Sequence, residues 1–379
     1  MKINELPTPC YVIDERKLRK NLEILKKVKD DTGCKILLAQ KAFSNFFEYP
    51  LIGQYLDGTT ASGLFEAKLG YEKMGKENHV FAPAFKESEI GELTDICEHL
   101  VFNSFSQLEK YADFCKEKGV SIGIRVNPEC STQGDHAIYD PCAPGSRLGV
   151  TLANFREDLV EKLDGIHFHT LCEQNSDDLE TTLKAMEEKF GKYLKLPNIK
   201  WLNMGGGHLM THKDYDCDEL IRILQEFKAK YPNLRLILEP GSAFTWRTGY
   251  LVSTVEDIVE NGGVRTAMLD VSFACHMPDC LEMPYKPAIL GARDPEPGEK
   301  GWRMGGNSCL AGDYYGDWIF DRDLRVGDRI VFEDMIHYTM VKTTMFNGVA
   351  HPAIAIVRRD GAIEIIREFG YEDFKSRMS

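Results

Sequence analysis

The chain has 379 residues, and its 59 acidic against 46 basic residues give a formal net charge of −13. Such a charge repels nucleic acid and anionic lipid, so the sequence predicts no nucleic-acid partner and no membrane partner. No run approaches the roughly 20 apolar residues that span a bilayer, and the start, MKINELPTPCYVID, lacks the pattern of a secretion signal. We therefore expect a cytoplasmic location.

The first two thirds of the chain alternate between apolar and amphipathic segments. A strand-like start is followed by residues 16–29, where Leu18, Leu22 and Leu25 recur at helical spacing. Short runs that are apolar along their length predict a parallel α/β structure, and seven or eight such units favour a TIM-type (β/α)8 barrel over an open sheet. The predicted strands cover residues 35–39, 79–83, 99–103, 121–127, 165–169, 200–207 and 235–241.

The pattern changes beyond about residue 245. Strands there are joined by Gly-Asp and Asp-Gly turns with few helices between them, which predicts an antiparallel β domain. The length of the chain fits either two domains or one large barrel with an addition. We therefore predict a barrel domain over residues 15–244 and a β domain built from residues 1–14 and 245–379.

Unusual residues follow several of the predicted barrel strands. Lys41 follows the first strand, His167 and His169 lie two apart on one strand face, glycines fill positions 205–207, and Glu239 ends the next strand. Active sites of such barrels form where the carboxyl ends of the strands meet. Singly, each residue has a plain explanation, such as a solvated loop lysine or a tight glycine turn. The His-x-His pair lacks a third ligand at a suitable spacing, so we expect no metal.

Together, these residues meet the requirements of pyridoxal 5'-phosphate. A lysine can form an imine with the cofactor's aldehyde, and a carboxylate can keep its ring nitrogen protonated. Glycine backbone N–H groups at a strand end can approach a phosphate closely. The sequence therefore predicts pyridoxal 5'-phosphate as the cofactor.

The chain resembles the alanine-racemase-like, or fold type III, decarboxylases, the group that contains ornithine, arginine and diaminopimelate decarboxylases. The resemblance covers nearly the whole length and rests on the ordered motifs TPCYVID, AQKAFS, GIHFHTLCEQ, NMGGG, LEPG, GGNSCLAGD and HYTMVKTTMFNG. It implies a decarboxylase that acts as a homodimer with shared active sites. The β domain would then contribute to both the active site and the dimer interface.

The resemblance also implies roles for individual residues. Lys41 would hold the cofactor as a Schiff base, His169 would stack on its ring, and Glu239 would pair with the ring nitrogen. Cys309, from the other chain, would return a proton to the carbon that lost carbon dioxide. Arg125 is a candidate for contact with the ring's phenolic oxygen, and a structural role is its alternative. The residues implied around the phosphate are Gly206, Gly207, Gly241 and Tyr338.

Departures from the family pattern bear on the substrate. Ser242 stands where diaminopimelate decarboxylases have an arginine, Cys172 replaces a serine, and Leu310 replaces an acidic residue. A substrate with an amino acid group at its far end would therefore lack partners here. The segment CHMPDCLEMPY resembles instead the decarboxylases of carboxylated polyamines, and carboxylates near it could bind an ammonium group. The residues predicted to bind substrate are Asp270, His276, Asp279 and Asp313.

We therefore predict decarboxylation of a small cationic carboxylated polyamine, a step of spermidine-type polyamine biosynthesis. Ordinary turn or strand-end roles stay open for Asp270 and Asp279. Within the same fold, the alternative is a diaminopimelate decarboxylase or another basic amino acid decarboxylase. The alternative of another class is a non-catalytic homologue that binds the cofactor or acts through protein contacts.

Overall fold

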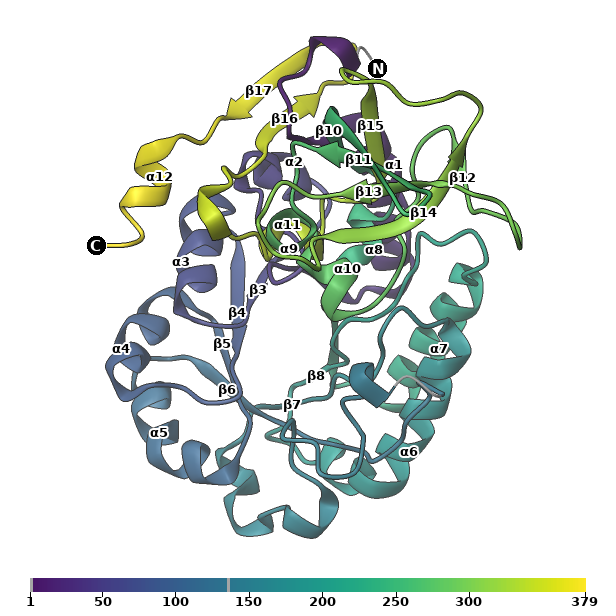
Figure 1. The fold of residues 1–379 in the computed structure, drawn as a ribbon. Coiled ribbons are helices and arrows are strands. Elements are labelled where there is room, and N and C mark those ends of the chain that lie inside the picture. The colour runs from purple at the N-terminus through teal and green to yellow at the C-terminus, as the bar shows by residue number, and fades with distance from the viewer. Residues whose placement is uncertain (1–2, 135–136) are drawn as a thin grey trace. The chain divides into compact units, whose positions relative to one another are not determined.

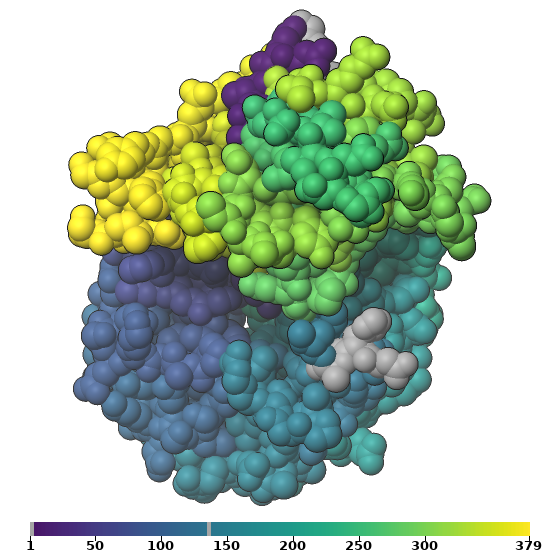
Figure 2. All heavy atoms as spheres, in the orientation of Figure 1, coloured from purple at the N-terminus to yellow at the C-terminus, as the bar shows by residue number. Residues whose placement is uncertain are grey.

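The structure is a computed structural model that describes residues 3–134 and 137–379. The chain divides into two compact units, Asn21–Phe244 and the combination of Met1–Lys20 with Thr245–Ser379. In Figures 1 and 2, the purple N-terminal residues lie among the green and yellow residues of the last third of the chain, so both chain ends build the second unit. Among the described residues, no helix has the length and apolar character that crossing a bilayer requires.

The first unit is a closed barrel of eight parallel strands, which confirms the predicted (β/α)8 fold. Each strand pairs with the next along the chain, and β9 returns to pair with β2. The strands are β2 (Lys35–Ala39), β3 (Gly58–Ala61), β4 (Glu77–Phe81), β5 (His99–Phe102), β6 (Ser121–Arg125), β7 (Gly165–His167), β8 (Trp201–Asn203) and β9 (Arg235–Leu238).

Helices precede, connect or follow most of the barrel strands. They are α1 (Glu15–Thr32), α2 (Tyr49–Ile52), α3 (Leu64–Lys73), α4 (Glu87–Ile96), α5 (Phe105–Glu117), α6 (Ser176–Leu194), α7 (Cys217–Lys230) and α8 (Ser242–Thr245). The connection from β6 to β7 differs, because its described residues form short 3-10 turns, such as Glu157–Lys162, and no α-helix. One crossover therefore departs from the predicted alternation of strands and helices.

An indole ring fills the middle of the barrel. A Cβ atom built on Gly123 would lie 2.3 Å from the Trp201 ring, and one on Gly165 would lie 2.0 Å from it. Glycine on the two neighbouring strands therefore makes room for tryptophan in the packed interior that such barrels require. Trp201 shares this apolar layer with Leu37, Val101 and Ile237.

The second unit contains a nine-stranded, mostly antiparallel sheet, as predicted for the C-terminal part of the chain. The first strand of the chain, β1, pairs with β10 and β16 in this sheet. The strands are β1 (Cys10–Asp14), β10 (Gly249–Asn261), β11 (Val264–Leu269), β12 (Ala292–Arg293), β13 (Trp302–Gly305), β14 (Tyr314–Phe320), β15 (Arg329–Glu333), β16 (Ala353–Val357) and β17 (Ile363–Arg367). Four short helices accompany them: α9 (Phe273–His276), α10 (Pro278–Glu282), α11 (Tyr338–Val341) and α12 (Tyr371–Lys375).

Candidate active site

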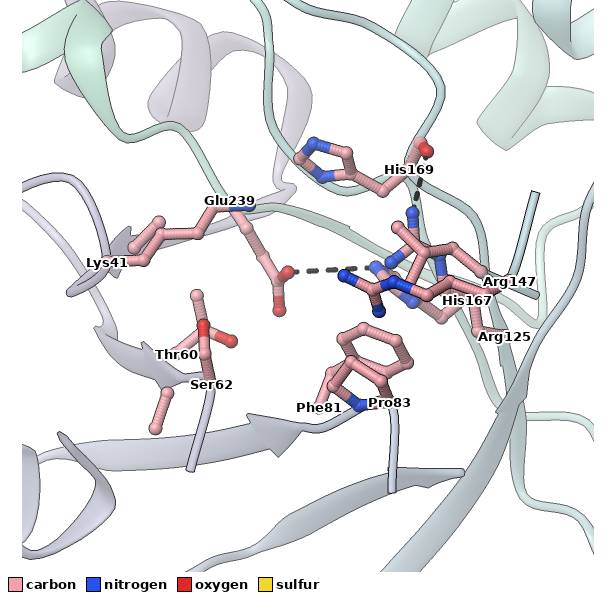
Figure 3. Close-up of a pocket in the computed structure, with 13 residues that line it drawn as sticks. Lys41, Thr60, Ser62, Phe81, Pro83, Arg125, Arg147, His167, His169 and Glu239 are labelled. Atoms are coloured by element: carbon pink, nitrogen blue, oxygen red, sulfur yellow. Dashed lines mark hydrogen bonds and ion pairs between the residues drawn. The ribbon is translucent and has the colours of Figure 1, made fainter. Parts of the chain in front are cut away.

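A cavity of about 250 Å³ lies in the barrel unit, at the carboxyl ends of its strands. Residues at or just past the ends of six strands line it, and charged and aromatic side chains point into it from different sides (Figure 3). The polar and aromatic lining residues are Lys41, Thr60, Ser62, Phe81, Arg125, Arg147, His167, His169 and Glu239. Three residues predicted from the sequence, Lys41, His169 and Glu239, thus share one cavity.

Lys41 is placed by a tight turn after β2. The Ala42 backbone N–H donates to Ala39 O at 3.0 Å, and the Phe43 N–H donates to Gln40 O at the same distance. The Lys41 side chain is exposed to the cavity and donates no hydrogen bond to any residue that the structure describes. Desolvation lowers the pKa of Lys41, and the Arg125 charge adds to this effect. An amine with a lowered pKa is a better nucleophile toward an aldehyde.

Hydrogen bonds on both sides fix the orientation of His169. Its ring Nδ1 accepts a bond of 3.0 Å from the Gly206 backbone N–H. Its carbonyl oxygen accepts a bond of 3.0 Å from the Arg125 guanidinium, which stacks 4.7 Å from the centre of the Phe81 ring. Burial lowers the pKa of His169 well below its usual value, so the imidazole is neutral. A neutral, fixed ring of this kind suits stacking on a flat aromatic ligand.

The glycine run packs too closely for any side chain. A Cβ on Gly206 would lie 2.3 Å from Glu239 O, and one on Gly207 would lie 2.1 Å from Leu171 O. Gly205 and Gly207 also have positive φ values of 68° and 88°, which residues with side chains rarely adopt. The loop after β8 therefore lies against the loop after β7 with its backbone bare. Gly241 is buried in the turn that leads from β9 to α8.

Glu239 is a buried carboxylate with one oxygen hydrogen-bonded to an amide and the other facing a histidine. Its Oε1 accepts a 2.7 Å hydrogen bond from the Asn203 side-chain amide, and its Oε2 lies 3.7 Å from His167 Nε2. Burial raises the pKa of Glu239, whereas hydrogen bonds from Asn203 and Thr60 act in the opposite direction. A cationic ring nitrogen facing this carboxylate would favour its ionised form.

The comparisons with known proteins agree over the full chain. A model of the family described as "Pyridoxal-dependent decarboxylase, C-terminal sheet domain" matches residues 10–336. This chain belongs to the pyridoxal-dependent decarboxylases. It is 48% identical over 378 residues to the carboxyaminopropylagmatine decarboxylase of Synechocystis sp., covering 100% of this chain and 97% of that protein.

Two further relatives come from Campylobacter jejuni. The carboxynorspermidine/carboxyspermidine decarboxylase of that organism is 43% identical over 388 residues, with 100% of both chains covered. The crystal structure of its carboxynorspermidine decarboxylase complexed with norspermidine matches with a TM-score of 0.90 and 42% identity, covering 98% of this chain and 100% of that one. This decarboxylase therefore shares both sequence and fold with enzymes that act on carboxylated polyamines.

The barrel cavity of the decarboxylase fits pyridoxal phosphate. It holds an amine without a hydrogen bond to any described residue, a neutral imidazole with a fixed ring, and a buried carboxylate. The glycine loop beside it has bare backbone of the kind that binds phosphate. Lys41, His169, Glu239, Gly206 and Gly207 are the residues that would hold the cofactor.

Sequence reasoning missed several residues of the cavity wall. Thr60 and Ser62 come from β3 and the residue after it, and Arg147 comes from the irregular segment between β6 and β7. The β3 sequence, Gly-Thr-Thr-Ala, has no apolar run, and Arg147 lies in no periodic pattern. Phe81 ends β4 in the structure, but the predicted strand 79–83 placed it in the middle, so the sequence offered no signal for it.

Three of the predicted residues of the sheet unit lie on connected segments. Asp313 Oδ1 accepts a bond of 3.1 Å from the Ala274 N–H, and its Oδ2 accepts one of 3.0 Å from the Ser308 N–H. Cys309 is exposed, and its N–H donates to the Asn347 side chain at 2.9 Å. Tyr338 begins helix α11, in the same segment as Asn347. Asp313 thus fixes one end of the Cys309 loop.

The other predicted substrate ligands already have partners within the sheet unit. Asp270 accepts hydrogen bonds of 2.7 Å from Ser253 Oγ and 2.9 Å from the Thr254 N–H, which is the structural role that the sequence left open. His276 is fully buried, so contact with substrate would require movement of its segment. Asp279 forms an ion pair of 2.6 Å with Lys342. A substrate-binding role for these three residues stays a prediction.

A second cluster of titratable side chains lies at the amino ends of the barrel strands. Donor atoms of Glu77, His79 and His99 lie within 4.8 Å of one another, a set that could in principle hold a metal ion. The Lys35 ammonium, however, already pairs with the Glu77 carboxylate, whose other oxygen bonds to His79 Nε2 at 2.8 Å. Arg235 adds a further positive charge to the surroundings of both imidazoles. We therefore treat this cluster as an internal ion pair.

Proposed function

We propose that this decarboxylase converts carboxynorspermidine or carboxyspermidine to norspermidine or spermidine. The observation that carries the proposal is the single cavity that holds Lys41, His169 and Glu239, in a chain 43% identical along its whole length to a carboxynorspermidine/carboxyspermidine decarboxylase. The acidic surface of the chain, with a net charge of −13, favours a cationic substrate.

The reaction needs a sink for the electrons of the broken bond between carbon and carboxylate, and pyridoxal phosphate supplies it when bound. Lys41 would hold the cofactor through its side-chain amine. The Glu239 carboxylate would keep the ring nitrogen protonated, and the His169 ring would stack on the cofactor. Gly206, Gly207 and Gly241 would line the phosphate, Gly206 through its bare Cα because its N–H already donates to His169 Nδ1. Tyr338 stays the further phosphate contact that the family resemblance assigns. Cys309 Sγ delivers a proton to the carbon that has lost carbon dioxide.

A second candidate substrate is carboxyaminopropylagmatine. The relative with that printed activity is 48% identical, against 43% for the carboxynorspermidine/carboxyspermidine enzyme. The candidate substrates share a carboxylated aminopropyl end, which lies at the reacting centre, and differ in the far cation: guanidinium in the agmatine derivative and ammonium in the others. A planar guanidinium requires a paired carboxylate geometry that an ammonium does not.

The deciding experiment measures carbon dioxide release by the holoenzyme from four compounds: carboxynorspermidine, carboxyspermidine, carboxyaminopropylagmatine and diaminopimelate. We expect kcat/KM to be highest for one of the first two. A higher value for carboxyaminopropylagmatine would transfer the proposal to the second candidate. Activity restricted to diaminopimelate, or carbon dioxide release from none of the four, would contradict both. Ser242 and Leu310 predict that diaminopimelate is a poor substrate.

We also propose a homodimer in which Cys309 serves the partner's active site. Cys309 is exposed on the sheet unit, and exposed Leu310, Tyr314 and Phe346 belong to the same or connected segments. Mixing Lys41→Ala with Cys309→Ala subunits tests this arrangement, because half of the dimers formed are hybrids in which one of the two sites is intact. Recovery of about a quarter of wild-type activity is expected. A fully active monomer, or no recovery after proven subunit exchange, would contradict it.

A further inference from the structure

His167 is a buried histidine to which the proposed function gives no role. It is the last residue of β7, only 2% exposed, and it lies two residues before His169. Neither ring nitrogen has a hydrogen-bond partner among the described residues. Burying a polar group without a partner costs about 1–3 kcal/mol, so such a side chain calls for a reason.

The polar group that faces His167 is the Glu239 carboxylate. Nε2 of His167 lies 3.7 Å from Glu239 Oε2, and the two side chains point toward each other within the cavity wall (Figure 3). This separation exceeds a hydrogen bond by less than 1 Å, and hydrogen bonds of catalytic groups often tighten only when the ligand is bound. The Phe81 ring, with its centre 5.5 Å from that of the imidazole, shields this side from water.

The two oxygens of Glu239 differ in how they are held. Asn203 fixes Oε1 through a 2.7 Å hydrogen bond, and Asn203 itself accepts a bond of 2.9 Å from the Gly205 N–H. The Thr60 hydroxyl also hydrogen-bonds to this carboxylate. A donor at Oε2 would add a further restraint against turning about the bond to its chain. A neutral imidazole carries one N–H and can supply that donor. Burial and the nearby Arg125 and Lys41 charges keep His167 neutral by lowering its pKa.

We propose that His167 is a positioning residue, whose Nε2–H donates to Glu239 Oε2 and holds the carboxylate in the orientation that faces the cofactor's ring nitrogen. The inference rests on the proposed function, because it needs pyridoxal phosphate in the cavity. Asn203 and His167 then form a two-sided support for the one carboxylate that sets the protonation of the ring. His167 ends β7, and His169 follows two positions later in the loop that lines the same cavity.

The test compares three holoenzyme variants that differ in where they carry an N–H. In His167→Gln, the amide nitrogen reaches roughly the position of the imidazole Nε2, whereas in His167→Asn it reaches only that of Nδ1. His167→Leu keeps the bulk and has no donor. We expect Leu and Asn to weaken binding of pyridoxal phosphate by about 10–100-fold, the value of one hydrogen bond to a charged group, and to reduce the visible absorbance of the bound cofactor. The Gln variant should stay within about threefold of wild type.

A purely structural role makes different predictions. It would lower the melting temperature of the apoenzyme without changing the absorbance of the loaded enzyme, and Gln would then do as much damage as Asn. Either outcome would overturn the proposal. If the Leu variant fails to fold, the difference in cofactor affinity between the Gln and Asn variants still tests the proposal.

A double-mutant cycle isolates the contact with Glu239. In the Glu239→Gln background, His167→Leu should change cofactor affinity by no more than about twofold, because the charged acceptor is gone. An undiminished effect in that background would contradict the proposal. A wild-type enzyme that binds the cofactor but releases no carbon dioxide would refute the proposed function alone. A wild-type protein that binds no cofactor would overturn both.

Discussion

The two ends of the barrel carry similar titratable residues, which pair with one another at the amino end and line a cavity at the carboxyl end. The amino end has Lys35, Glu77, His79 and His99, and the carboxyl end has Lys41, Glu239, His167 and His169. At the amino end the charges cancel, because Lys35 and Glu77 form an ion pair and His79 Nε2 bonds to the same carboxylate. His79 is buried, and His99 and Glu77 are mostly buried.

The carboxyl end is left open. Lys41 has no hydrogen bond to any described residue, Glu239 Oε2 and His167 Nε2 lie just beyond hydrogen-bond distance, and Lys41 and Glu239 both line the cavity. At the amino end the lysine and the carboxylate pair with each other, although Nδ1 of His79 and of His99 has no hydrogen-bond partner among the described residues. At the carboxyl end the lysine and the carboxylate both line a cavity, as expected of a cluster that binds a ligand. The comparison predicts that mutations at the two ends will affect different measurements.

The largest effect is expected from replacing the two lysines with alanine. Lys41→Ala should abolish both turnover and the visible absorbance of the bound cofactor, because the nucleophilic amine is lost. Lys35→Ala should keep the absorbance and lower the melting temperature, since it leaves the Glu77 carboxylate without its cation. Absorbance spectra and thermal denaturation of both purified variants check the pair. A Lys41→Ala enzyme that kept turnover and the visible absorbance would show that Lys41 does not hold the cofactor.

The carboxylates offer the next contrast. Glu239→Gln should reduce kcat by about 100-fold or more, since a preorganised charge at the site of reaction is removed. Glu77→Gln should leave kcat unchanged and reduce the free energy of unfolding by about 1–3 kcal/mol, because Lys35 loses its partner. Steady-state kinetics and urea denaturation measure the two effects. Equal effects of both substitutions on kcat would show that the amino-end cluster also serves the reaction.

The sequence predicted the carboxyl-end cluster better than the amino-end one, for a physical reason. A lysine or glutamate that directly follows an apolar run breaks the pattern, so Lys41 and Glu239 were conspicuous. Glu77 and His99 begin their strands, where polar residues are ordinary. The amino-end cluster can be recognised only from the strand register, which sets His79 of β4 opposite His99 of β5.

Strand β3 shows a second limit of sequence reasoning. Its residues, Gly-Thr-Thr-Ala, are neither an apolar run nor an alternating pattern, so the eighth barrel strand was not located. The structure explains the composition: a Cβ at Gly58 would lie 1.8 Å from Glu77 O, and Thr59 Oγ1 donates to the Asn78 side chain at 2.9 Å. Close packing and a buried hydrogen bond replace the apolar side chains there, and neither leaves a periodic signal.

The apolar layer between the two clusters can be tested through its glycines. In Gly165→Ala, the added methyl group would overlap the Trp201 ring, and we expect a loss of about 3 kcal/mol in the free energy of unfolding. Gly91 in helix α4 is the matched control, because no atom lies within 4 Å of a Cβ built there. Gly91→Ala should be neutral or stabilising by up to about 1 kcal/mol. Urea denaturation compares them, and equal behaviour would mean that the indole can move aside.

The smallest expected effect is a difference in pH dependence. Burial and the neighbouring positive charges lower the pKa of His99 to about 2. Below about pH 6.5, His99 therefore binds a proton in the unfolded chain but not in the folded protein. Its contribution to the free energy of unfolding is complete above that pH and decreases as the pH falls below it. At about pH 5.5 this histidine alone should cost about 1.3 kcal/mol relative to neutral pH.

Replacing His99 with glutamine removes this titration. The variant loses the stacking of His99 on His79 and Trp201, at ring separations of 3.9 and 4.9 Å, so it should be less stable at neutral pH. Its free energy of unfolding should nevertheless fall less steeply between about pH 7.5 and pH 5.5, by about 1 kcal/mol, than that of wild type. His212→Gln, at a partly exposed position, controls for the loss of one histidine. If the free energy of unfolding of wild type and of His99→Gln changed in parallel with pH, His99 would take up a proton while the protein is folded. The amino-end cluster would then not be a closed ion pair.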